Sequence, residues 1–74
     1  MRSIDQRLGD VIRKIRLDQD LSQEKLGFKA KLSRNQIGNI ERGESSATIG
    51  ALYGIARALG HRASEILAEA ERAG

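Results

Sequence analysis

The sequence predicts an all-α fold, a compact domain of five short helices, and three observations lead to this prediction. Proline is absent, and the only aromatic residues are one Phe and one Tyr, while the helix-favouring residues Ala, Leu, Ile, Glu, Lys and Arg are abundant. Apolar side chains recur at spacings of three and four, which places them on one face of a helix. Residues that commonly cap helices stand at the boundaries between these apolar patterns.

The first expected helix covers about residues 4–18, with an apolar face formed by Leu8, Val11, Ile12 and Ile15. The second is short, about residues 23–30. Ser22 is suited to cap it, because a serine hydroxyl accepts a hydrogen bond from an unpaired N–H group of the first turn.

The third expected helix begins after Ser33, which forms a capping-box pattern with Gln36 three residues later. It ends at Gly43, since glycine readily adopts the left-handed conformation that follows many helices. Ile37 and Ile40 form its buried side.

Thr48 is expected to cap the fourth helix, which ends at Gly60. Its apolar stripe consists of Ile49, Leu52, Ile55, Ala56 and Leu59. The fifth helix covers about residues 63–72, and Ile66, Leu67 and Ala70 line up on one of its sides.

Length and composition limit the function. The 74 residues fit one domain (1–74), and we expect neither a signal peptide nor a membrane span, so the expected location is the cytoplasm. A domain this small is marginally stable. Glycines at 9, 27, 38, 50 and 54 fall inside the expected helices and cost together about 2.5–5 kcal/mol. We therefore expect a weak monomer that gains stability by forming a homodimer.

The net charge of +3 is concentrated in one segment. Residues 25–42 carry Lys25, Lys29, Lys31, Arg34 and Arg42 against Glu41 alone. Such a cluster is typical of a surface that binds a polyanion, although a solvated basic face without a partner would look the same.

Two stretches, LSQEKL (21–26) and LSRNQIGNIERG (32–43), resemble the lambda-repressor-like, XRE-type helix-turn-helix regulators. The similarity extends from about Leu8 to Leu67 and includes IARALG (55–60). It implies a helix-turn-helix at about residues 22–42. It also implies a transcriptional regulator that binds double-stranded DNA as a dimer, on a near-palindromic operator. The size is closest to the controller proteins of restriction–modification systems, and RNA polymerase is a candidate partner.

The resemblance implies that Arg34, Asn35 and Asn39 read bases from the third helix. Arginine can bond to guanine through two hydrogen bonds, and asparagine to adenine. Gly38 lies on the same expected face, where a missing side chain would let the helix approach the groove floor. Ordinary solvent-exposed helix surface is the alternative for Arg34, Asn35 and Asn39. For Gly38 the alternative is sequence drift without a purpose.

The resemblance also implies that Gln23 holds a phosphate at the start of the second helix and braces the third helix. Ser22 shares that helix start, where free N–H groups and the helix dipole favour anions. The further phosphate candidates are Lys25, Arg42, Ser45 and Ser46. In this family a Glu of the third helix pairs with an Arg of the first, which assigns an ion pair to Glu41 and Arg16.

Two residues depart from the family pattern. Lys31 stands where the turn often has glycine, so a positive φ would strain it. Gly27 stands where alanine is usual. The candidates for a dimer interface are Tyr53, Ala63, Ile66, Leu67 and Ala70, and the alternative for each is the core of the monomer.

Other functions are less well supported. The chain has no Cys, a single His61, and no paired acidic motif or glycine-rich phosphate loop, so we expect no enzyme, cofactor or metal. One alternative is an antitoxin that binds a toxin and its own promoter. Another is a coat protein that binds nucleic acid without sequence preference.

Overall fold

The structure is a computed structural model that describes residues 2–73, and this range forms five α-helices and no strand. The all-α prediction is therefore confirmed, with the helices in the expected order. Their bounds are α1 (Ile4–Asp18), α2 (Gln23–Ala30), α3 (Arg34–Glu41), α4 (Ile49–Leu59) and α5 (Ala63–Arg72).

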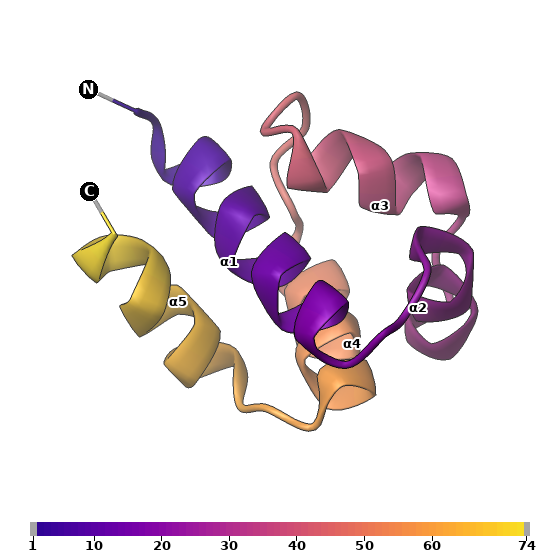
Figure 1. Cartoon of the computed structure of the whole chain (residues 1–74). Coiled ribbons are helices and arrows are strands. Elements are labelled where there is room, and N and C mark those ends of the chain that lie inside the picture. Colours follow the sequence, from indigo (N-terminus) through magenta and orange to yellow (C-terminus); the bar gives the residue numbers. More distant parts are fainter. Residues whose placement is uncertain (1, 74) are drawn as a thin grey trace.

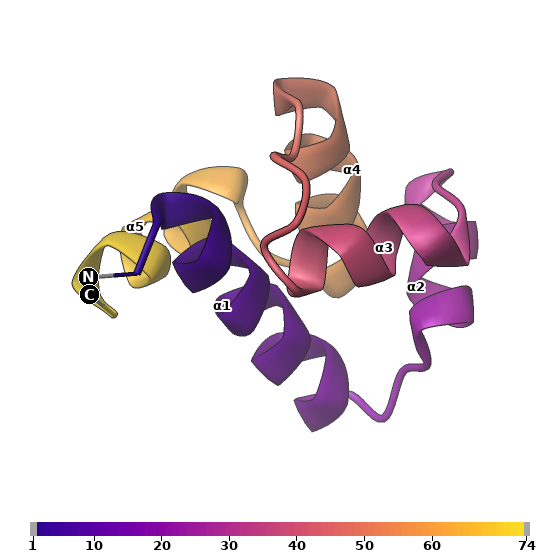
Figure 2. The same cartoon turned by 90° about the horizontal axis from the view of Figure 1, so that it is seen from above.

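The helices divide into two groups around α4. Helices α1 and α5 lie side by side and run in opposite directions, so that α5 ends where α1 begins (Figures 1 and 2). Helices α2 and α3 pack against each other on the other side of α1 (Figure 1). Helix α4 contacts α1, α2 and α5. This arrangement leaves one long side of α3 at the edge of the molecule.

Every helix contributes one large side chain to the centre of the core. The side chains that are less than 2% exposed are Ile12, Leu26, Ile37, Ile55 and Ile66, one from each helix in order. Burying one such side chain contributes about 1.5–3 kcal/mol. The core therefore depends on all five helices.

Two expectations about apolar residues are wrong. Ile49, assigned to the buried stripe of α4, is 74% exposed, because the first turn of α4 projects beyond the rest of the bundle (Figure 2). Ile66 and Ala70, proposed for a dimer interface, are 0% exposed. They belong to the monomer's own core, where a partner chain cannot reach them.

The expected caps are present. Ser33 Oγ accepts a hydrogen bond from the Gln36 N–H at 3.0 Å, and Gln36 Oε1 accepts one from the Ser33 N–H at 2.7 Å. Lys31 ends α2 at φ 61°, the left-handed conformation that strains a residue with a side chain. The chain thus makes the tight turn between α2 and α3 without the usual glycine.

Glycine sets the distances between α3 and its neighbours. A Cβ added at Gly9 on α1 would collide with the backbone oxygens of Ile40 and Glu41. A Cβ added at Gly27 on α2 would lie 2.6 Å from the backbone oxygen of Leu32. Side chains at these two positions would push α3 away, so both glycines help to define where α3 lies.

Candidate nucleic-acid interface

Helix α3 has one buried face and one exposed face. Ile37 and Ile40 point into the core, with 0% and 6% of their surfaces exposed. Arg34 and Asn35 are exposed, and Asn39 is partly exposed. Helix α3 itself lies at the edge of the molecule (Figure 1). Its exposed side thus carries the guanidinium of Arg34 and the side-chain amides of Asn35 and Asn39.

A buried ion pair holds the end of α3 against α1. Arg16 Nε donates to Glu41 Oε2 at 2.7 Å and Arg16 Nη2 donates to Glu41 Oε1 at 3.0 Å, so the pair has two parallel hydrogen bonds. The side chains are only 8% and 2% exposed. Arg16 Nη1 also donates to the backbone oxygen of Leu21 at 2.8 Å, which ties the start of the α2 region to the same pair.

Gln23, the first residue of α2, joins this network. Its Nε2 donates to Glu41 Oε1 at 3.0 Å, so the carboxylate of α3 is bonded to both α1 and α2. A side-chain amide has two N–H donors and this contact uses one. Gln23 therefore braces α3 and keeps a second donor that can bond to another group.

Gly38 is not an open position on the exposed face of α3, contrary to the expectation from sequence. It is buried, and the side chains of Gln23 and Arg42 cover it. A Cβ at this position would lie 3.0 Å from Arg42 Nη1 and 3.7 Å from the Gln23 amide. The missing side chain therefore makes room for neighbouring side chains of the protein, not for the floor of a DNA groove.

Arg42, just after α3, is bonded within the protein. Its Nη2 donates to Asn39 Oδ1 at 2.6 Å, and its Nε lies 3.2 Å from Glu44 Oε2. More than half of the Arg42 and Glu44 side chains is exposed. Glu44 was not expected from the sequence to take part in this site. Its position two residues after Arg42 is the one sequence feature that indicates this ion pair.

The remaining phosphate candidates differ in what they already contact. Ser22 Oγ accepts from the Lys25 N–H at 3.0 Å as the cap of α2, and the Lys25 side chain is exposed. In the loop after α3, Ser45 is exposed, whereas the Ser46 hydroxyl donates to Asp5 Oδ2 at 2.6 Å. The structure thus brings Gln23 and Arg42 together over Gly38 and bonds Ser46 to the first turn of α1.

Residues 12–66 match the model of a helix-turn-helix family. The chain belongs to this family. The match includes α3, which carries the exposed face described above, and α2, which packs against it. It confirms the resemblance to XRE-type regulators.

Three relatives illustrate the relationship. The control protein C.BamHI of Bacillus amyloliquefaciens is 38% identical over 60 residues, which is 80% of this chain and 74% of that protein. The restriction–modification controller C.AhdI of Aeromonas hydrophila is 31% identical, with a TM-score of 0.82 over 84% of this chain and 94% of that one. The controller C.Esp1396I is 30% identical, with a TM-score of 0.84 over the whole of both chains. The chain is thus a helix-turn-helix DNA-binding regulator related to controller proteins, and the antitoxin alternative is not favoured.

Among the interface candidates of this helix-turn-helix protein, three remain accessible. Tyr53 is 66% exposed, Leu67 is 38% exposed and Ala63 is partly buried. Ile49 precedes Tyr53 by four residues, one helical turn, so the two side chains lie on the same side of α4. They form an exposed apolar pair, of which the sequence pattern had assigned Ile49 to the apolar stripe and Tyr53 to a dimer interface.

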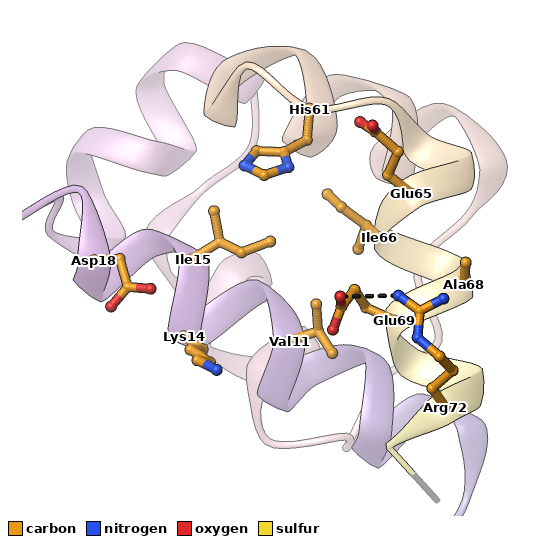
Figure 3. Close-up of a pocket in the computed structure, with 10 residues that line it drawn as sticks. All are labelled: Val11, Lys14, Ile15, Asp18, His61, Glu65, Ile66, Ala68, Glu69 and Arg72. Carbon is orange, nitrogen blue, oxygen red and sulfur yellow. Dashed lines mark hydrogen bonds and ion pairs between the residues drawn. The ribbon is translucent and has the colours of Figure 1, made fainter.

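A groove separate from α3 runs between α1 and α5 (Figure 3). Val11, Ile15 and Ile66 form apolar parts of its lining, and His61 enters it from the turn before α5.

Within residues 2–73, no three His, Asp or Glu side chains are placed to hold a metal ion together. None of the helices in this range combines the length and the apolar character that crossing a membrane requires.

Proposed function

We propose that the protein is a dimeric, sequence-specific regulator that inserts α3 into the DNA major groove at a near-palindromic operator, as a restriction–modification controller in the cytoplasm. The observation that carries this proposal is the position of α3. Its inner end is held by the Arg16–Glu41 pair and Gln23, while its outer face offers only side chains that can bond to base edges.

The chemistry of the exposed face suits base reading. The major groove shows a different pattern of donors and acceptors for each base pair, and an α-helix fits into it. Arg34 is suited to donate two hydrogen bonds to guanine, and Asn35 and Asn39 are suited to adenine. All three lie on one short helix whose orientation is fixed by buried contacts, so they would reach successive bases together.

The ends of α2 and α3 are suited to hold phosphates on either side of the groove. Gln23 has a free N–H donor beside the start of α2, where Ser22 lies and where the helix dipole attracts an anion. Arg42 and Lys25 add positive charge, and Ser45 adds an exposed hydroxyl. Ser46 contributes only if its bond to Asp5 opens. These contacts would supply affinity and register without carrying sequence information.

A homodimer would use the exposed apolar residues of α4 and α5. Ile49 and Tyr53 form the centre of this surface, and Leu67 and Ala63 extend it. A two-fold dimer places two reading helices about 34 Å apart, one turn of DNA, and this spacing requires a near-palindromic operator. RNA polymerase is the partner that activation of a promoter would require, whereas repression requires only occupancy of the operator.

Selection from random-sequence duplexes tests the proposal. The wild type should enrich one near-palindromic sequence. Arg34→Ala should lose about 1–3 kcal/mol of specific binding per contacted base pair and relax the preference at one symmetric guanine, because one bidentate contact is lost in each half-site. Arg13→Ala removes the same charge from an exposed position on α1 and should enrich the wild-type sequence. If the wild type enriches nothing, or if Arg34→Ala keeps the guanine preference, the proposal is refuted.

A further inference from the structure

The Arg42 guanidinium contacts two side chains, the amide of Asn39 and the carboxylate of Glu44. On one side its Nη2 donates to Oδ1 of Asn39, a candidate base reader. On the other side its Nε faces the Glu44 carboxylate at 3.2 Å. Its Nη1 passes over Gly38, where a side chain would leave only 3.0 Å between the two groups. Arg42 thus lies flat along α3 and uses an oxygen that Asn39 needs for pairing with adenine.

We propose that Glu44 occupies the place of a DNA phosphate in the free protein. Glu44 holds Arg42 against Asn39 until a DNA phosphate replaces Glu44 as the ion-pair partner of the guanidinium. The exchange moves Arg42 to the DNA backbone and frees Asn39 Oδ1 to accept from a base, so that backbone contact and base reading are coupled. This proposal rests on the proposed function of α3 and adds a regulatory role for Glu44 to it.

The electrostatics favour such an exchange. Glu44 is 60% and Arg42 55% exposed, and an ion pair this exposed is weak because water screens it. A phosphate in the duplex, with its dense charge, competes well against a single carboxylate. The buried Arg16–Glu41 pair, at 8% and 2% exposure, is not open to the same competition. The chain therefore contains one ion pair that fixes α3 and another that can open on its surface.

The expected consequence is a change in the salt dependence of DNA binding. Each phosphate neutralised by a free cation changes the slope of log K against log salt by about −0.9. In the wild type, opening the pair leaves the Glu44 carboxylate beside the DNA phosphates, and its negative charge offsets the positive charge that Arg42 brings to them. Glu44→Gln removes the offset. The slope should then steepen by up to about 0.9 per protomer, which at 0.1 M salt corresponds to up to about 8-fold tighter binding per protomer.

The experiment measures binding to a short duplex of fixed, arbitrary sequence between about 50 and 200 mM salt. Glu44→Gln should bind more tightly and with a steeper slope. Glu71→Gln is the matched control, because it makes the same charge change on α5, on the far side of α1 from α3 (Figure 1). Thermal melting of each variant checks that both exposed substitutions leave the fold intact.

A double-mutant cycle with Arg42→Gln decides whether the effect passes through Arg42. In that background, Glu44→Gln should change the affinity and the slope less than it does in the wild type, because no ion pair has to open and only the repulsion between the carboxylate and the DNA is removed. Equal effects of Glu44→Gln with and without Arg42, or equal effects of Glu44→Gln and Glu71→Gln, would overturn the inference. Such a result leaves the random-sequence selection unaffected, whereas a wild type that binds no duplex at all refutes both proposals.

Discussion

Replacing Glu41 by alanine tests the idea that a buried ion pair, not the turn alone, fixes the orientation of α3. The carboxylate accepts two hydrogen bonds from Arg16 and one from Gln23. In Glu41→Ala these donors lose their acceptor at a position that is almost closed to water. Arg16 keeps only the backbone oxygen of Leu21, which cannot neutralise its charge.

The magnitude follows from the burial. Removing one partner of a buried ion pair costs about 3–5 kcal/mol, because the other charge is left uncompensated. Domains of this length have a total stability of roughly 4–11 kcal/mol, taking the typical value per residue. A loss of 1 kcal/mol lowers the melting temperature of such a domain by about 4–8 °C. Glu41→Ala should therefore lower the melting temperature by at least about 12 °C, or leave the domain unfolded at room temperature.

Thermal melting followed by circular dichroism measures this loss. Glu71→Ala, at an exposed position of α5, is the control and should change the melting temperature little. The double variant Arg16→Met/Glu41→Leu removes both charges and should recover much of the stability, because no buried charge is left unpaired. If Glu41→Ala melted like the control, the Arg16–Glu41 pair would not hold α3. The claim that this buried pair fixes the orientation of α3 would then be refuted.

Three further predictions concern packing and assembly. Gly9→Ala should destabilise the protein in urea titration, since its Cβ would collide with the backbone at the end of α3. A Cβ at Gly50 would meet no atom within 4 Å, so Gly50→Ala should stabilise the protein by about 0.5–1 kcal/mol. Lys31→Gly should raise the melting temperature, because glycine adopts the left-handed conformation at φ 61° without strain; no change or a decrease would show that Lys31 is not strained. Ile49→Asp should convert a dimer into a monomer in analytical ultracentrifugation while the helical content stays the same. A dimer that survives this substitution would place the interface elsewhere.

The helices of this protein were predictable because their signals are local. The boundaries of α3 depend on Ser33 and Gln36, which bond to each other within one turn. Fully buried residues such as Ile37 and Ile55 follow from the apolar spacing of a single helix. Membership of the helix-turn-helix family was equally visible, because the motif lies in one continuous stretch.

The candidate site was only partly predictable, because several of its contacts join residues far apart in the chain. The Arg16–Glu41 pair was expected only through the family resemblance. Gln23 was expected to brace the third helix, but only the structure shows that it does so by bonding to the Glu41 carboxylate. Gly38 was expected on the open face of α3, but side chains from two directions cover it. Such covering depends on how helices cross, and the residues of one helix do not contain that information.

The sequence by itself determined the helices, their caps and the family, since helix formation depends on side chains three and four residues apart. Tertiary structure decided which apolar residues remain exposed. Ile49 has the spacing of a core residue but lies on a turn of α4 that projects beyond its neighbours, while Ile66 lies where α5 packs against α1. Periodicity gives the direction in which a side chain points along its own helix. Whether another helix lies in that direction depends on the packing of the whole chain.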